Sequence, residues 1–315
     1  MHTLTSWWHG LQAVWPNISL LLGLLWLLYV IVLGIWILLQ KREPIATLSW
    51  LLSLVLLPYI GFLIYHLLGP TRITRQSLKR SKARAGLMPL TQANLPDNAS
   101  ALMQLNAASA GFAPASARQV ELLQNGAATY AALEAAFAAA THHIHLEYYI
   151  FEPDTSGSRI RDALVRAAQR GVAVRLLLDR LGSKNINDRF LSPLREAGAD
   201  IAFFHPFRFK HIWRPRYNLR THRKIVVIDG TAGFTGGINI TDTENETLRS
   251  DAYVDLHLRA DGEIVRWLQL AFVSDWLYAG GKFKADARYF PMPAEQPGPV
   301  AAQVLAAGPD TPWEP

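Results

Sequence analysis

The chain has 315 residues, half of them hydrophobic, and a formal net charge of +6 at pH 7. It contains no cysteine, which excludes disulfide bonds and thiolate chemistry. The hydrophobic excess is concentrated between positions 18 and 68, so a membrane segment has to be separated from a soluble part before either is interpreted.

Two long apolar runs lie near the start of the chain, at residues 18–39 and 45–68, and neither contains Asp, Glu, Lys or Arg. At about 1.5 Å per residue, each can cross a hydrocarbon core of roughly 30 Å. Pro58 and Gly61 predict a kink in the second run. The first sixteen residues lack Lys and Arg, which disfavours a cleaved signal peptide. We therefore expect residues 1–70 to form a two-span transmembrane hairpin, with a pair of buried core helices as the alternative.

A basic collar and linker follows at residues 71–116. The loop between the two runs carries only Lys41 and Arg42, whereas six basic residues follow the second run: Arg72, Arg75, Lys79, Arg80, Lys82 and Arg84. Because Lys and Arg are enriched on the cytoplasmic side of a span, we expect the large C-terminal part to lie in the cytoplasm, next to a multi-pass anchor. The collar is equally suited to anionic lipid headgroups, at about 1 kcal/mol per basic residue.

Residues 117–288 have the pattern of an α/β domain with a mixed sheet flanked by helices. Strands are expected at 120–123, 143–152, 172–178, 201–204, 224–228, 233–235 and 253–258, and helices at 127–141, 158–170, 188–197 and 263–278. Alternation in the second strand places Ile144, Leu146 and Tyr148 on one face. The last helix is expected to be amphipathic. Residues 289–315 form a Pro- and Ala-rich tail.

The segment RTHRKIVVIDGTAGFTGGIN carries polar residues at both ends of a β-branched run. The run at 225–228 predicts a central strand. Since side chains alternate along a strand, His222 and Lys224 are expected side by side on one face. A neutral imidazole can attack phosphorus, and an adjacent ammonium can hold the non-bridging oxygens of a phosphodiester.

Four further residues follow this pair at fixed spacings: Asp229, Gly236, Gly237 and Asn239. The glycine pair allows backbone N–H groups to approach an anion, and Asn239 adds a neutral donor. Taken singly, these residues have ordinary explanations, because Asp-Gly is usually a turn and a Lys at a strand end is usually solvated. The joint pattern of six positions is far more specific, and it predicts a phosphodiester-binding site.

The segment resembles the HxKxxxxD motif of the phospholipase D superfamily, with its downstream Gly-Gly-x-Asn extension. KREPIATLSWLLSLVLLPYIGFLIYHLLG resembles the membrane hairpin of bacterial cardiolipin synthases. IHLEYYIFEPDTSG and YVDLHLRADGEIVRWLQLAFVSDW resemble the regions that flank their first motif. The resemblance extends from about residue 20 to residue 310, and it implies a phospholipase D-like half-domain held at a bacterial inner membrane.

The resemblance implies transfer of a phosphatidyl group between two phosphatidylglycerol molecules, which gives cardiolipin and glycerol. His222 would be the nucleophile that forms a phosphohistidine, or its acid/base counterpart. Lys224 would bind the phosphate, and Asp229 would have a structural or polarising part in the motif. The implied partners are phosphatidylglycerol and anionic membrane lipid.

The resemblance also implies a supporting set: Asn239, Gly236, Gly237, Asp255 and Glu147. Asp255 would lie where relatives place a carboxylate that hydrogen-bonds the catalytic imidazole, although a plain strand-end charge explains it equally well. Glu147 is a further candidate of the same sort. No metal and no cofactor are expected, because neighbouring residues of the cluster His142-His143-x-His145 would face opposite ways in a strand and no acidic or Cys ligand set accompanies them.

The chain departs from the family pattern because it contains one HxKxxxxD motif, whereas the family site is built from two. The end of the tail, AAGPDTPWEP, resembles the start of a second half. We expect a fragment that is inactive alone, or else a half that pairs with a second HKD half-domain or with another copy of itself. An exposed apolar surface would favour such association.

A second class of function is left open by the segment FRFKHIWRPRYNLRTHRK, which interleaves Arg and Lys with Phe, Trp and Tyr. Such a segment is also typical of nucleic-acid binding. The alternatives are therefore a membrane-tethered phosphodiesterase or nuclease of the same superfamily, or an inactive lipid-binding fragment. The membrane hairpin favours lipid, since Trp213 and Tyr217 are suited to the membrane interface.

Overall fold

The computed structural model describes residues 2–39, 44–68, 112–204, 221–291 and 297–306. The chain divides into a helical N-terminal unit and an α/β unit, and each is described by itself. Most of the basic collar and nearly all of the aromatic and basic segment before His222 lie outside the described residues.

The N-terminal unit contains three helices, α1 (His2–Leu39), α2 (Pro44–Leu56) and α3 (Pro58–Leu68). Within the described residues, one stretch, Leu20–Leu39, is long and apolar enough to cross a membrane. The second apolar run is interrupted before Pro58, where the kink was expected, and it forms the two shorter helices α2 and α3. Proline lacks the N–H that would continue the helical hydrogen bonds, which explains the break. A second crossing therefore remains a proposal.

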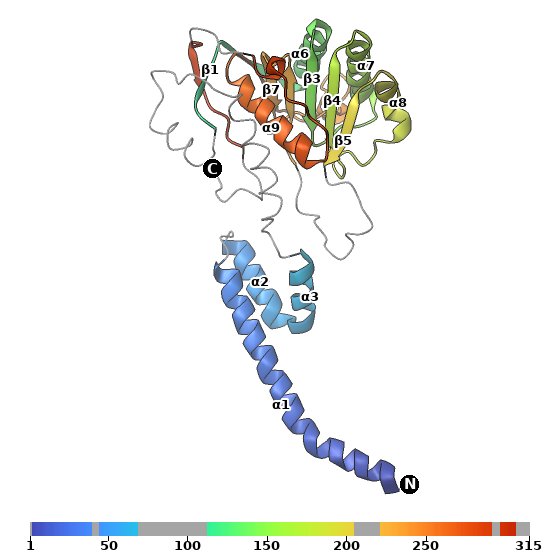
Figure 1. Cartoon of the computed structure of the whole chain (residues 1–315), viewed down its shortest axis with the longest axis vertical. Coiled ribbons are helices and arrows are strands. Elements are labelled where there is room, and N and C mark those ends of the chain that lie inside the picture. Colours follow the sequence, from blue (N-terminus) through green and yellow to red (C-terminus); the bar gives the residue numbers. More distant parts are fainter. Residues whose placement is uncertain (1, 40–43, 69–111, 205–220, 292–296, 307–315) are drawn as a thin grey trace. The chain divides into compact units, whose positions relative to one another are not determined.

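The α/β unit is built on a seven-stranded sheet with the order β2-β8-β7-β6-β3-β4-β5. Figure 1 shows its strands β3, β4 and β5 side by side. Its strands are β2 (Gln119–Gln124), β3 (His143–Tyr148), β4 (Ala173–Asp179), β5 (Asp200–Phe204), β6 (Ile225–Ile228), β7 (Ala232–Gly236) and β8 (Leu256–Asp261). The pairs β3·β4 and β4·β5 are parallel, and the other pairs are antiparallel. The predicted mixed α/β fold is therefore confirmed, although the last strand begins three residues later than expected.

Helices cover both faces of this sheet. Helices α6 (Asn125–Ala139), α7 (Thr155–Gln169) and α8 (Asp188–Glu196) share one buried cluster with Ile144 and Leu146 of β3. Helix α9 (Val265–Tyr278) shares a second cluster with Ile225 and Val227 of β6. The two clusters lie on opposite faces, since adjacent residues of a strand point opposite ways.

The alternation predicted for β3 is confirmed, with a consequence that the sequence pattern did not suggest. Ile144, Leu146 and Tyr148 lie in the cluster of α6, α7 and α8. The intervening residues His143, His145 and Glu147 are equally buried, and His145 contacts Gln269 of α9. A column of polar side chains therefore runs beneath α9, where an aliphatic face would be usual.

The amphipathic character predicted for α9 is wrong, because every residue from Val265 to Trp276 is buried. The outer side of the helix is covered by segments from both ends of the domain. Strand β1 (Ala115–Ala117) pairs antiparallel with β9 (Val300–Ala302), and Phe112, Tyr289 and Phe290 belong to the same apolar cluster. The short 3-10 helix η4 (Ala287–Tyr289) brings Tyr289 to this position.

Asp229 occupies the turn between β6 and β7. Asp229 and Gly230 have φ values of 52° and 68°, and Thr231 N donates to Ile228 O over 3.1 Å, which defines a type I′ hairpin turn. The Asp229 carboxylate accepts hydrogen bonds of 2.8–2.9 Å from the backbone N–H groups of residues 141–143 and from the Thr141 hydroxyl. It therefore joins this hairpin to the start of β3.

Of the two parts implied for Asp229, structural or polarising, this position favours the structural one. The motif aspartate lies at the far end of β6 from Lys224, about 16 Å away for five residues of extended chain. Although burial raises the pKa of Asp229, its hydrogen bonds with His143, Thr141 and His142 outweigh that effect and lower it. Asp229 thus stabilises β6, the strand that directly follows His222 and Lys224.

We expect Asp229→Ala to destabilise the α/β unit by about 3 kcal/mol, because it removes the acceptor of three backbone N–H groups, two of them partly buried, and places Ala at positive φ. Asp229→Asn should cost less, since Asn keeps an acceptor and tolerates positive φ. The measurement is urea unfolding of the full chain in detergent micelles, followed by circular dichroism.

The stability that the Asp229 carboxylate contributes should change with pH in a defined direction. A lowered folded pKa means that the carboxylate contributes its stability above its unfolded pKa of about 3.9 and loses it as the pH falls through the folded value. The difference between wild type and Asp229→Asn should therefore shrink below about pH 4. A difference that stays constant with pH would show that the charge has no part in holding the turn.

Candidate active site

His222 and Lys224 lie together at the start of β6, as the spacing predicts. Lys224 Nζ lies 3.2 Å from His222 Nδ1 and 3.1 Å from the His222 carbonyl oxygen. His222 is exposed, whereas the Lys224 side chain is only 3% exposed. An accessible imidazole thus stands beside a cation that the protein holds in one place.

The electrostatics of the pair favour a neutral imidazole. Burial and the positive charge of Lys224 lower the pKa of His222, and Asp179 opposes them. Burial also lowers the pKa of Lys224, whereas the carboxylates of Glu244 and Asp255 raise it. Because an ammonium has no lone pair, His222 Nδ1 accepts the hydrogen bond from Lys224, and the ring proton is on Nε2 in this arrangement.

Tyr149 is an aromatic neighbour of the pair that the sequence did not single out. Its ring centroid lies 4.6 Å from that of His222, and Lys224 Nζ lies 6.0 Å from the same centroid. The residue directly follows β3, where the predicted strand continued to residue 152. An aromatic surface against the imidazole restricts the ring, and it favours the nearby cation.

Asn239 is buried and is held by Glu244, a carboxylate whose charge acts on Lys224. Its Oδ1 accepts from Ile150 N over 3.2 Å, and its Nδ2 and backbone N donate to the Glu244 carboxylate over 2.7 and 2.6 Å. The hydroxyl of Tyr130, a residue of α6, donates to the Asn239 carbonyl oxygen. A carboxamide has two N–H groups, so one remains for a further acceptor.

Glu244 is the second residue that sequence reasoning missed. It lies in the 3-10 helix η3 (Asp242–Glu244), five residues after Asn239, and its charge raises the pKa of Lys224. Burial raises the pKa of Glu244, while hydrogen bonds from Asn239 and the charge of Lys224 lower it. The sequence feature that could have identified Glu244 is an acidic residue five positions after Asn239.

The glycine pair provides space, a different role from the anion contact that was predicted. A Cβ on Gly236 would lie 2.6 Å from His257 Cα, and a Cβ on Gly237 would lie 2.1 Å from the Asp255 carboxylate. Gly237 N–H donates to the Leu256 carbonyl oxygen over 2.9 Å, so it is not available to an anion. The pair allows β8 and Asp255 to approach the site closely.

Asp255 and Glu147 do not bond to the imidazole as the resemblance implied. Among the described residues, the hydrogen-bond partner of the His222 ring is Lys224, and Asp255 Oδ1 accepts from Leu256 N. Asp255 acts on the site through its charge beside Lys224. Glu147 lies on the opposite face of the sheet, where Thr221 donates to it.

His257 completes the surroundings of Lys224. It lies opposite Gly236 in the β7·β8 ladder and is 1% exposed. Burial and the charge of Lys224 lower its pKa to about 4, so the ring is neutral at pH 7. Within the described part of the chain, neither ring nitrogen has a hydrogen-bond partner.

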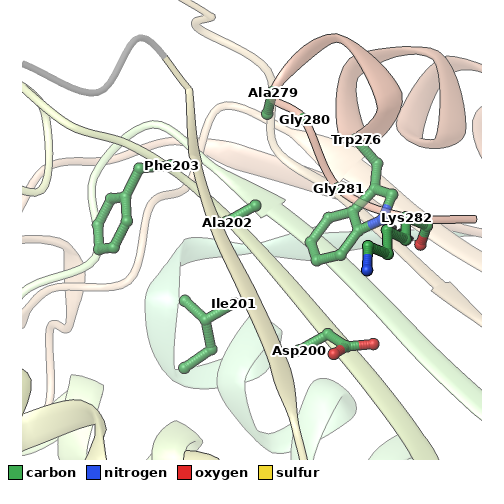
Figure 2. A pocket seen from close by; sticks show the side chains of 9 residues that line it. All are labelled: Asp200, Ile201, Ala202, Phe203, Trp276, Ala279, Gly280, Gly281 and Lys282. Atoms are coloured by element: carbon green, nitrogen blue, oxygen red, sulfur yellow. Dashed lines mark hydrogen bonds between the residues drawn. The ribbon is translucent and has the colours of Figure 1, made fainter. Parts of the chain in front are cut away.

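Two other features lie apart from this site. His142, His143 and His145 contact one another beneath α9, and their partners there include Arg175 and Tyr289, so the three rings do not simply alternate between faces as expected. An open hollow of about 350 Å³ is lined by residues of β5, by Trp276 of α9 and by the segment that follows α9: Asp200, Ile201, Ala202, Phe203, Trp276, Ala279, Gly280, Gly281 and Lys282 (Figure 2). None of the predicted site residues lines it.

Comparison with known families adds two matches. Residues 133–276 match the family described as "Cardiolipin synthase, PLD-like domain". Residues 24–70 match the family described as "Phospholipase_D-nuclease N-terminal". Together the two matches include more than half of the chain.

Curated bacterial proteins are similar over nearly the whole chain. Cardiolipin synthase 1 of Bacillus anthracis is 33% identical over 325 residues, which include 96% of this chain and 63% of that protein. Cardiolipin synthase of Alkalihalophilus pseudofirmus is 37% identical over 310 residues, which include 93% of this chain and 61% of that protein. The chain thus spans a little over three fifths of the length of these relatives.

Solved structures share lower similarity. A phospholipase D family member, Nuc from Salmonella typhimurium, has a TM-score of 0.39 and 18% identity, covering 53% of this chain and 94% of Nuc. Phosphatidylserine synthase of Haemophilus influenzae has a TM-score of 0.43 and 15% identity, covering 67% of this chain and 45% of that protein. On the family matches and the curated relatives, the chain belongs to the phospholipase D superfamily and is similar to the bacterial cardiolipin synthases.

Proposed function

We propose that this chain supplies one half of a phosphatidyltransferase site that converts two phosphatidylglycerol molecules into cardiolipin and glycerol. The observation that carries the proposal is the contact of an exposed, neutral imidazole with a buried ammonium at His222 and Lys224. This pair combines a nucleophile with an anion-binding cation, as phosphodiester chemistry requires. The curated relatives carry the name cardiolipin synthase.

The first step is attack on the donor lipid. The phosphodiester approaches Lys224, whose ammonium turns from His222 Nδ1 to the non-bridging oxygens. His222 then loses its Nε2 proton to solvent and takes a proton from solvent at Nδ1, so that the Nε2 lone pair is free to attack phosphorus. The P–O bond to the glycerol headgroup breaks, its electron pair stays on that oxygen, and glycerol leaves after taking a proton from a general acid. Lys224 and the free N–H of Asn239 stabilise the developing negative charge.

The second step reverses these roles. A headgroup hydroxyl of the second phosphatidylglycerol attacks the phosphohistidine and gives its proton to the same acid/base group. The P–N bond breaks, and its electron pair returns to His222 Nε2. The products are cardiolipin and the free enzyme.

The general acid is proposed to be the histidine of a second HxKxxxxD motif. The chain contains one such motif, so the second would come from another half-domain or from a second copy of this chain. Exposed apolar residues near the site suit such a contact: Leu122, Tyr253, Val254 and Leu256. Helix α1 and the proposed second crossing would hold the site at the cytoplasmic surface of the inner membrane, beside anionic lipid.

We expect His222→Gln to abolish formation of a covalent phosphatidyl-protein adduct on this chain when a second His-x-Lys motif is present, because it removes the proposed nucleophile. Lys224→Ala should slow its formation at least about 100-fold through loss of transition-state stabilisation. The assay follows transfer of label from ³²P-phosphatidylglycerol in mixed micelles, with the exposed Lys184→Ala as the control variant. Labelling of His222→Gln at the wild-type level would exclude the proposed nucleophile.

The effect of Lys224 on His222 is measurable without turnover. Because the Lys224 charge lowers the pKa of His222, Lys224→Met should raise it toward the ordinary value near 6.5. Titration of ¹⁵N-histidine signals, assigned with His222→Gln, measures the shift. An unchanged or lower pKa would show that the two groups do not interact in solution.

The need for a second motif is tested by reconstitution. Membranes that contain this chain should form cardiolipin from phosphatidylglycerol only when a second His-x-Lys motif is present. If two copies pair, a mixture of wild type and His222→Gln should lose activity more steeply than in proportion to the wild-type fraction. Turnover by a demonstrably monomeric chain would overturn the half-site proposal, and cleavage of single-stranded DNA without lipid turnover would favour a nuclease.

A further inference from the structure

The segment that carries His222 is anchored from its other face. Thr221 and Arg223 alternate with His222 and Lys224, so they point toward α9. Thr221 Oγ1 donates to Glu147 Oε1 over 2.5 Å. Arg223 Nη1 forms an ion pair with Asp275 Oδ2 of α9. Two carboxyl groups thus hold the residues on either side of the proposed nucleophile.

These two carboxyl groups are completely buried, because Glu147 and Asp275 are both 0% exposed. Two carboxylates and one guanidinium would leave a net negative charge inside the protein, which is costly. A single proton on the carboxyl pair would make the group neutral. Within the described residues, Glu147 Oε2 has no hydrogen-bond donor, so a carboxylate at this position would be only half satisfied.

The other groups around Glu147 do not supply the missing charge. On β3 the nearest polar residue on the same face is His145, which contacts Gln269 Oε1 and Arg175 Nη1 through its two ring nitrogens. The cross-strand neighbours of Glu147 are the apolar residues Leu177 on β4 and Ile225 on β6.

From α9 and the segment before β6, the charged groups that act on Glu147 are Asp275 and Arg223. Burial and the charge of Asp275 raise the pKa of Glu147 well above its ordinary value, while Arg223 and the Thr221 hydrogen bond oppose them. Asp275 raises the pKa of Glu147 further by offering an acceptor to its protonated form.

We propose that Glu147 and Asp275 share one proton and together act as a positioning pair for His222, with the proton on Glu147 and the negative charge on Asp275. Protonated Glu147 accepts from Thr221 through one oxygen and donates to Asp275 through the other. Asp275 keeps its charge for Arg223. The clamp fixes the backbone on both sides of His222, and thereby the direction of its ring beside Lys224.

The two partners should respond differently to removal of their charge. Gln at position 147 reproduces a protonated Glu, since its oxygen can accept from Thr221 and its NH₂ can donate to Asp275. We therefore expect Glu147→Gln to melt within a few degrees of wild type at pH 7. Asp275→Asn removes the negative charge that faces Arg223 and should melt at a much lower temperature. Glu121→Gln, at an exposed position on β2, is the matched control.

The pH dependence has a fixed sign. A raised folded pKa means that the contribution of Glu147 is complete below its unfolded pKa of about 4.3 and is lost as the pH rises through the folded value. Glu147→Gln does not titrate, so its melting temperature relative to wild type should increase steadily from pH 5 to pH 9. The control Glu121→Gln should show no such trend.

Thermal unfolding of the full chain in detergent micelles decides between the outcomes. A constant difference between Glu147→Gln and wild type across this range overturns the shared proton. If Asp275→Asn lowers the melting temperature only slightly and Glu147→Gln lowers it strongly, the proton resides on Asp275, and the assignment is overturned.

The positioning role, which rests on the proposed function of His222, has its own readout. In Glu147→Ala the ¹⁵N titration of His222 should move toward that of Lys224→Met, and Glu147→Gln should restore the wild-type curve. A wild-type curve in Glu147→Ala overturns positioning, even where stability is lost. Should His222→Gln instead retain label transfer from ³²P-phosphatidylglycerol, the proposed function fails, while the melting data still decide the carboxyl pair.

Discussion

Burial of the Lys224 ammonium is the interaction on which the site depends. A buried cation is costly unless charges and acceptors surround it, and removal of a single partner from such a group typically costs about 3–5 kcal/mol. Here the His222 carbonyl oxygen and ring nitrogen accept from Nζ, and the charges of Glu244 and Asp255 oppose the desolvation. These groups come from the start of β6, from η3 and from the residue before β8, so the site forms only when the sheet is assembled.

The four residues before β6 connect the two faces of the sheet. His222 and Lys224 lie on one side, while Thr221 bonds to Glu147 beneath α9 and Arg223 pairs with Asp275 of α9. Strict alternation makes this division unavoidable once the register of β6 is set. The turn at Asp229 sets that register from the opposite end of the strand. The motif aspartate therefore serves the geometry of the site from a distance, through four hydrogen bonds.

Much of this arrangement could be predicted from local sequence. The β-branched run at 225–228 and the two-residue spacing of His222 and Lys224 were enough to place both side chains on one face. Periodicity could not show that α9 is buried all round, because its cover comes from β1 and β9, which are far apart in the chain. The roles of the glycine pair and of Glu147 depend on which strand lies alongside, and pairing between distant strands leaves no local pattern.

The polar column beneath α9 explains why a helix without an exposed face still contains the charged residue Asp275. A helix buried on all sides would pack most simply with aliphatic residues, and replacing buried ion pairs by such residues is often neutral or stabilising. The column from His143 through His145 to Glu147 ends where Thr221 and Arg223 hold the loop that carries His222. Stability alone does not call for a charged group at that point. The charged group is needed for geometry, because the exposed His222 ring keeps one orientation only when contacts on the opposite face of the sheet fix its backbone.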